Sequence, residues 1–150
     1  MESCIFCNLS NEDKKWLLYE NEDWTVYLAD HQDYAGRCIV VCKQHCSSIS
    51  ELNICQWTSL KVIINSLESM LKYELGATMY NWSCLMNDAY KSDKPNPHIH
   101  FHVRPRYKEP VLLDHSEYID HEFAHHYINN HTIQITEETA NYIYSQLKKK

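Results

Sequence analysis

The sequence is that of a small acidic chain with enough apolar residues for one core. Its 150 residues carry a formal net charge of −6, and 44% of them are hydrophobic, a length and composition typical of a single domain. Only two glycines occur, which excludes the glycine-rich loops of P-loop and dinucleotide-binding proteins. The acidic balance argues against a basic surface for nucleic acid. We therefore expect one domain over residues 1–150 and no nucleic-acid partner.

The cysteines indicate a reducing compartment. There are seven, an odd number, and we find no secretory signal and no apolar run long enough for a membrane span, so we expect free thiols, a cytoplasmic location and no membrane association. Cys4 and Cys7 form a C-x-x-C pair, which predicts zinc binding or redox chemistry. Zinc is favoured, because a thioredoxin-like motif would follow a strand and no strand precedes Cys4.

The first half of the chain predicts three strands and a long helix. The strands are expected over residues 16–20, 24–29 and 37–42, where aromatic and β-branched residues alternate or cluster. Residues 48–51 and 53–56 both resemble capping boxes, and they precede a helix expected over residues 54–75. Gly76 ends that helix. Its predicted apolar stripe consists of Trp57, Leu60, Ile64, Leu67 and Leu71.

The second half predicts two further strands and a last helix. A strand is expected over residues 78–86, a polar loop over 87–97, and a fifth strand through His98 to Arg104. Residues 108–135 show no readable pattern. A helix begins at 136–138 and places Ala140, Ile143, Tyr144 and Leu147 on one face. The order predicts an α+β fold: a five-stranded antiparallel sheet with one long helix and a C-terminal helix.

Three histidines in the fifth strand carry the chemistry. His98, His100 and His102 alternate with apolar residues, so in a strand their imidazoles share one face while the apolar residues face the core. Imidazole suits nucleophilic, acid–base and zinc chemistry near neutral pH. The alternative is a histidine-rich strand that binds metal or faces solvent without catalysis.

The segment from His98 to Arg106 resembles the signature of the histidine triad (HIT) family of nucleotide-binding proteins. Cys4-Ile5-Phe6-Cys7 resembles the zinc-carrying branch of that family, and residues 40–45 resemble its strand-end segment, with Cys42 in place of the usual proline. The match covers residues 4–107 and leaves residues 108–150 as a C-terminal extension. Residues 92–97, which contain two prolines, depart from the family's Gly-Gln-Ser/Thr sequence.

The resemblance implies a HIT-like fold and a nucleotide-binding hydrolase or transferase. It would act at the α-phosphate of a dinucleoside polyphosphate or nucleoside phosphoramidate, with His100 as the nucleophile that forms a covalent nucleotidyl-histidine. His102 would hydrogen-bond the phosphate or the bridging atom. The resemblance also implies a homodimer.

The resemblance further assigns a metal site and substrate contacts. Two cysteines and two histidines would hold a structural zinc ion with no open coordination position. Asp30 would bind the ribose hydroxyls and Asn87 the phosphate end. Where the loop departs from the family, Lys94, Ser92 or Asn96 would replace the donors that the prolines remove. Independently of the resemblance, Arg104 and Arg106 either end the strand in solvent or contact a distal phosphate. The expected zinc ligands are Cys4, Cys7, His45 and His98.

Two alternative functions compete with this interpretation. One is a nucleotide-binding regulatory protein with little turnover. The other is a zinc metalloprotease, because His121-Glu122-x-x-His125 matches H-E-x-x-H and His131 stands at the spacing of a third ligand. Ile128 occupies the position where such a protease needs glycine.

Overall fold

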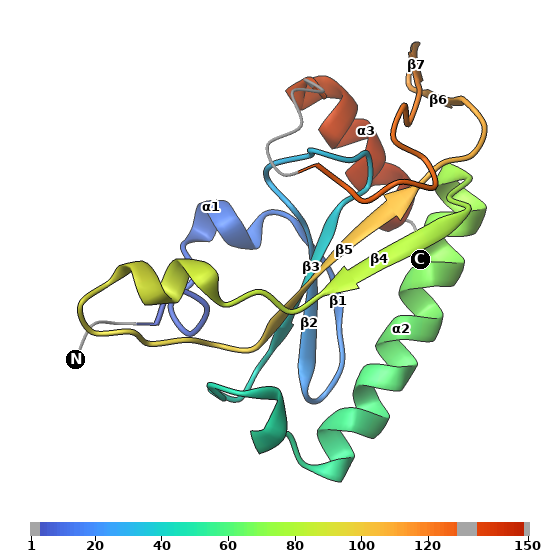
Figure 1. Cartoon of the computed structure of the whole chain (residues 1–150). Helices are drawn as coiled ribbons and strands as arrows, with labels where there is room; N and C mark the ends of the chain where they lie inside the picture. The colour runs from blue at the N-terminus through green and yellow to red at the C-terminus, as the bar shows by residue number, and fades with distance from the viewer. Residues whose placement is uncertain (1–3, 129–134, 149–150) are drawn as a thin grey trace.

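The computed structural model describes residues 4–128 and 135–148 and shows an α+β fold built on one antiparallel sheet (Figure 1). The five strands lie in the order β1-β2-β3-β5-β4, which confirms the expected fold class. A smaller two-stranded sheet of β6 (Val111–Leu113) and β7 (Ser116–Tyr118) follows. The strands of the main sheet are β1 (Leu17–Glu20), β2 (Trp24–Leu28), β3 (Cys38–Cys42), β4 (Met79–Ser83) and β5 (His100–Arg106).

The long helix α2 (Ile54–Leu75) has the predicted bounds, because both of its ends are set by local signals. Asn53 and Gln56 form the capping box, and Gly76 ends the helix in the left-handed conformation with φ 80°. The other predicted capping box, around Ser48, instead caps the short 3₁₀ helix η1 (Ile49–Glu51).

The buried face of α2 differs from the predicted stripe. Trp57 is 41% exposed, and Ile63 is buried where Ile64 was expected. The backbone carbonyl of Gln56 accepts a hydrogen bond from Nε1 of the buried Trp24, across 2.9 Å. The buried side chain of Gln56 also donates from Nε2 to Oε1 of Gln44 across 3.1 Å. Gln56 therefore takes the inward position, and the neighbouring Trp57 points toward solvent. The inward residues are Gln56, Leu60, Ile63, Leu67, Met70, Leu71 and Leu75.

The central strands position the histidines on the face opposite α2. Trp24, Val26 and Leu28 of β2 are buried against the helix side of the core. On β5, His100 and His102 pair with Val41 and Ile39 of β3. The two histidine side chains lie on the sheet face opposite α2. The ladder begins at His100 rather than His98, yet Ile99 still donates to the Cys46 carbonyl, which keeps the segment extended.

Two short helices and one hairpin have no counterpart in the sequence prediction. They are the short helix α1 (Asn11–Lys14), the 3₁₀ helix η2 (Asn87–Lys91) within the polar loop, and the hairpin of β6 (Val111–Leu113) and β7 (Ser116–Tyr118). β4 is also shorter than expected.

The C-terminal helix α3 (Glu137–Lys148) was predicted and packs on the rest of the fold. It buries Ala140, Ile143 and Leu147, and the half-buried Tyr144 donates from its hydroxyl to the Leu17 carbonyl. No helix in the described part of the chain is both long and apolar enough to cross a membrane.

Candidate active site

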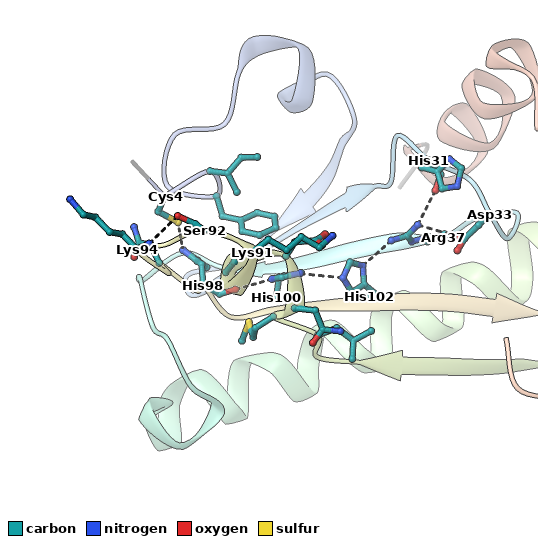
Figure 2. A pocket seen from close by; sticks show the side chains of 18 of the residues that line it. Cys4, His31, Asp33, Arg37, Lys91, Ser92, Lys94, His98, His100 and His102 are labelled. Carbon is teal, nitrogen blue, oxygen red and sulfur yellow. Dashed lines mark hydrogen bonds and ion pairs between the residues drawn. The ribbon is translucent and has the colours of Figure 1, made fainter. Parts of the chain in front are cut away.

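A cavity of about 750 Å³ opens on the sheet face that carries the three histidines (Figure 2). The N-terminal segment at Cys4–Phe6, the loop containing η2, and the β2–β3 loop form its walls around β5. Its charged side chains are four cations and two carboxylates, so the cavity is positive in a chain of net charge −6. These charged residues are Asp33, Arg37, Asp88, Lys91, Lys94 and Arg104.

Hydrogen bonds assign the proton positions on His102 and His100. Nη2 of Arg37 lies 3.0 Å from Nδ1 of His102. A guanidinium only donates, so Nδ1 accepts and the His102 ring proton lies on Nε2. Nε2 of His102 is 3.2 Å from Nε2 of His100, and the latter therefore presents its lone pair. Nδ1 of His100 donates to the His98 carbonyl across 2.8 Å, which completes a consistent neutral tautomer.

The same logic orients His98 away from the other two rings. Its Nε2 donates to the backbone carbonyl of Cys42 across 2.6 Å. The lone pair of Nδ1 then faces the cysteine pair, with the Cys4 sulfur 3.2 Å away and the Cys7 sulfur 3.5 Å away. His98 is thus prepared to bind a metal, whereas His100 and His102 face the cavity.

Burial keeps these imidazoles neutral. It is the main cause that lowers the pKa of His98 and of His100, both of which are nearly inaccessible to solvent. Burial also lowers the pKa of His102 to about 4, and the neighbouring His100, Arg37 and Arg104 act in the same direction. At neutral pH the Nε2 atom of His100 is therefore uncharged and carries a lone pair.

The predicted metal ligands come together at one end of the histidine row. The ligand atoms of Cys4, Cys7, His45 and His98 all lie within 4.8 Å of one another, and no other such group occurs in residues 4–128 and 135–148. A tetrahedral zinc ion with sulfur and nitrogen ligands needs separations of about 3.3–3.8 Å between them. The distances at Cys4 and Cys7, including 3.4 Å from Cys7 to His45, are close to this range. These residues fit a closed zinc site.

The N-terminal segment links this cluster to the cavity. Phe6 lies between the two cysteines, and its ring centroid is 4.4 Å from that of His100 and 5.6 Å from that of His98. Ile5 and Phe6 also line a second cavity of about 130 Å³, with Leu9, Trp16, Tyr27, Ile39 and Val41 among its other walls. A metal held by Cys4 and Cys7 would therefore fix a wall shared by both cavities.

The four predicted substrate-binding residues lie at two places. Asn87, Lys94 and Arg104 line the histidine cavity, the first two exposed and Arg104 buried. Nε of Arg104 donates to Asp33 across 2.9 Å, and its guanidinium lies 4.4 Å from the Tyr127 ring centroid. Asp30 instead lines the smaller cavity, and its Oδ1 accepts from the His31 amide.

Arg37 and Asp33 are site residues that the sequence prediction missed. Asp33 bridges two arginines, with Oδ1 3.3 Å from Nη1 of Arg37 and Oδ2 2.9 Å from Nε of Arg104. Alternation along β5 places the predicted Arg104 on the histidine face. Arg37 could have been found only from the pairing register of β3 with β5, which the sequence does not state.

The helix required by the metalloprotease alternative is absent. Residues 121–124 form turns, and Ala124 has a left-handed backbone with φ 67°. The carbonyls of Glu122 and His125 both accept from the Arg106 guanidinium. His121 and His125 therefore do not share a helical face. His131, the third expected ligand, lies outside the described residues.

Comparison with known proteins identifies the fold. No protein-family model matches the sequence, and no curated protein matches it. A hypothetical histidine triad nucleotide-binding protein from Sulfolobus tokodaii strain7 has a TM-score of 0.65 at 16% identity, over 97% of this chain and 89% of its own. The fold is that of histidine triad proteins.

Two other structures share the histidine triad fold. A zinc-bound histidine triad family protein from Mycobacterium smegmatis has a TM-score of 0.58 at 18% identity, over 97% of this chain and 93% of its own. A uridylyltransferase has a TM-score of 0.64 at 19% identity over 98% of this chain, which spans only 46% of that larger protein.

Proposed function

We propose that the protein is a nucleotide-binding hydrolase or transferase that acts at the α-phosphate of a nucleotidyl substrate. The observation that carries the proposal is the arrangement of His100 and His102. His100 keeps a lone pair on Nε2, which accepts from the N–H of His102 across 3.2 Å, while a carbonyl holds its Nδ1 proton. A phosphate oxygen that takes over the His102 N–H would free this lone pair for attack. The similar structures include a nucleotide-binding histidine triad protein and a uridylyltransferase, which supports a nucleotidyl substrate.

The proposed reaction proceeds in two displacements. Nε2 of His100 attacks the α-phosphorus, and the bond from phosphorus to the leaving group breaks with its electron pair on the leaving atom. The N–H of His102 hydrogen-bonds that atom or a non-bridging oxygen, and the His98 carbonyl stabilises the positive charge on the nucleotidylated ring. Water then attacks phosphorus, the phosphorus–nitrogen bond breaks with its electron pair returning to Nε2 of His100, and a nucleoside monophosphate leaves while the proton from the water passes to solvent. A hydroxyl acceptor in place of water gives transfer.

A neutral nucleophile suits this substrate. A phosphate ester is anionic and repels an anionic attacking group, whereas the imidazole of His100 carries no charge because burial lowers its pKa. The cations around the cavity further favour an anionic ligand.

The smaller cavity is the proposed nucleoside site. Its walls are mainly apolar and it adjoins the histidine cavity through Ile5 and Phe6, so a base held there directs its 5′-phosphate toward His100. Asp30 stands at this cavity and would accept hydrogen bonds from ribose hydroxyls. Asn87 and Lys94 line the phosphate side.

The same proposal includes a structural zinc ion held by the two cysteines, His45 and His98. Four protein ligands leave no open position, so zinc would fasten the N-terminal segment and orient His98 rather than activate water. The Mycobacterium smegmatis protein of the same fold is zinc-bound. All seven cysteines are unpaired, which fits the proposed cytoplasmic location.

A homodimer is the proposed assembly. β4 is an edge strand, and α2 exposes Ile54, Trp57, Val62 and Tyr73. Exposed apolar side chains beside an unpaired strand edge are suited to pairing with a second copy.

Trapping of the covalent intermediate tests the proposal. The full-length protein is mixed with adenosine 5′-phosphoramidate or diadenosine triphosphate, quenched at early times, and measured by intact-protein mass spectrometry. We expect an added adenylyl group on the wild type and on His115→Ala, whose histidine is exposed outside the cavity, but not on His100→Ala. Adenylylation of His100→Ala to the same extent as the wild type would refute the assignment.

A regulatory nucleotide binder is the second candidate. Two prolines, Pro95 and Pro97, lie in the loop beside the cavity and supply no amide donors to a phosphate. If neither the wild type nor His100→Ala acquires an adenylyl group while both bind adenosine monophosphate, the regulatory function replaces the enzymatic one.

A further inference from the structure

Two arginines face each other beside His102. Cys38 of β3 pairs with Val103 of β5, and one further step in this antiparallel register places Arg37 opposite Arg104. Both side chains line the histidine cavity. Like charges directly opposite each other on one sheet face are destabilising, so the pair weakens the fold unless it is compensated.

The compensation within the protein is incomplete. Asp33, which is 1% exposed, contacts both guanidiniums, but one carboxylate balances only one of two positive charges. Nε of Arg37 and Nη1 of Arg104 are buried and have no hydrogen-bond partner in the described part of the chain. Arg104 as a whole is only 5% exposed. Buried donors without acceptors are costly and rare, and here they border a cavity.

We propose that Arg37 and Arg104, held by Asp33, form a second anion subsite that binds a phosphate on the leaving-group side of the substrate. The inference rests on the proposed function and deepens it. It implies that the substrate is a nucleoside di- or polyphosphate derivative, in which the group released from the α-phosphorus is itself a phosphate.

The order of side chains along the cavity gives the direction. Figure 2 shows His98, His100, His102 and Arg37 in one row. Nε2 of His102 faces His100, and its Nδ1 faces Arg37. An α-phosphate at His100 therefore places its leaving group beside His102 and the next anionic group near the arginines.

The other cations of the cavity are placed differently. Lys94 lies at the opposite end of the row, near Cys4 and Ser92 (Figure 2), and Lys91 is paired with Asp88 at 2.5 Å. The two guanidiniums are thus the cations beside His102 that have no carboxylate each to themselves, since they share Asp33. In the first displacement they would stabilise the negative charge that the departing phosphate acquires when its bond to the α-phosphorus breaks. An ammonia leaving group makes no such contact.

Nucleotide binding without turnover tests the subsite. Titration calorimetry on His100→Ala compares adenosine diphosphate with adenosine monophosphate, which differ by the second phosphate. We expect the diphosphate to bind about tenfold more tightly or better, the scale of charge-assisted hydrogen bonds. Adding Arg37→Gln or Arg104→Gln to His100→Ala should bring the ratio of the two dissociation constants close to one. Adding Lys61→Gln, which removes an equal charge on the exposed face of α2, should preserve the ratio.

The outcomes separate this inference from the proposed function. Equal binding of the two nucleotides to His100→Ala overturns the subsite alone, whereas binding of neither overturns it together with the nucleotide-binding proposal. A ratio that survives both arginine substitutions also overturns the subsite. Circular dichroism confirms that each variant is folded. If Arg37→Gln does not fold, Arg37→Lys keeps the charge but lacks the planar fork, and it should give an intermediate ratio.

Discussion

Nη2 of Arg37 donates to Nδ1 of His102 across 3.0 Å, and this one contact determines how the histidine row carries its protons. It leaves the His102 proton on Nε2 and so requires a lone pair on Nε2 of His100. Arg37 also carries a positive charge that opposes protonation of both rings. A residue at the first position before β3 thereby prepares the proposed nucleophile on β5.

Removing that charge should shift the pH dependence of nucleotidyl transfer to His100. Arg37 is one of the causes that lower the pKa of His100 and of His102, although burial is the larger one. In Arg37→Gln the amide can still donate to Nδ1, but the charge is gone, so both pKa values should rise. We expect the acid limb of the reaction to lie below pH 6.5 in the wild type and to move upward in the variant.

Early-time adenylylation measured between pH 4 and 8 gives this comparison. Adenosine 5′-phosphoramidate is the suitable substrate, because it has no second phosphate and the proposed anion subsite then plays no part. Lys61→Gln should leave the acid limb unmoved. An identical acid limb in the wild type and Arg37→Gln would show that the arginine does not control these protons.

Loss of the cysteine pair should remove the metal and weaken the fold. Cys4 and Cys7 lie in the N-terminal segment, and their sulfurs are 3.2 and 3.5 Å from Nδ1 of His98. Structural zinc contributes directly to folding free energy. We expect one zinc per chain by plasma emission spectrometry in the wild type, none in Cys4→Ser with Cys7→Ser, and a lower melting temperature for that variant.

Two controls make the metal prediction specific. Cys55→Ser changes an exposed thiol on α2 and should retain zinc, as should His121→Ala. Loss of the metal in His121→Ala, with retention when the two cysteines are replaced, would instead support the metalloprotease alternative.

Breaking the buried ion pair of Arg106 with Asp120 should cost more stability than breaking an exposed pair. Nε and Nη2 of Arg106 contact the two carboxylate oxygens at 2.7 and 3.1 Å, and both side chains are inaccessible to solvent. Asp120→Ala leaves a buried guanidinium without its counter-charge, which costs about 3–5 kcal/mol of unfolding free energy. Urea denaturation measures this cost.

The exposed pair of Lys43 with Glu20 is the matched control for Asp120→Ala. Its side chains are 35% and 52% exposed, and removal of such a pair costs about 0–1 kcal/mol. Similar losses for Asp120→Ala and Glu20→Ala would mean that breaking the buried pair costs no more than breaking an exposed one.

The parts of the fold that sequence could predict are those determined by neighbours in the chain. The bounds of α2 follow from the capping residues Asn53 and Gln56 and from the left-handed Gly76. The histidine face follows from alternation within one strand. The zinc ligands come from three separate segments. The C-x-x-C spacing alone indicated Cys4 and Cys7, whereas His45 and His98 were named as ligands only through the resemblance, and zinc binding itself stays a prediction.

The parts that sequence could not predict depend on contacts between distant segments. Arg37 and Asp33 join the site through the pairing of β3 with β5 and through salt bridges to residue 104. Residues 120–125 follow no helical or strand pattern, because their path is set by carbonyls and a carboxylate that converge on Arg106. The H-E-x-x-H match lies in this segment, where Ala124 in the left-handed region prevents the helix that would give the motif meaning.

Gly36 should be the less replaceable of the two glycines, although both have positive φ, 79° at Gly36 and 80° at Gly76. A Cβ at Gly36 would lie 2.7 Å from Cδ1 of the buried Leu75, whereas one at Gly76 would meet its nearest neighbour, Val111, at 3.3 Å. Backbone strain of about 1–2 kcal/mol applies to both, and overpacking adds about 1–3 kcal/mol at Gly36. Urea denaturation should therefore show a larger loss for Gly36→Ala than for Gly76→Ala. Equal losses of stability in the two variants would show that Leu75 yields to the added methyl group.

Because Gly36 precedes Arg37, its substitution should also reduce the preference for adenosine diphosphate over the monophosphate in the His100→Ala background, and Gly76→Ala should not.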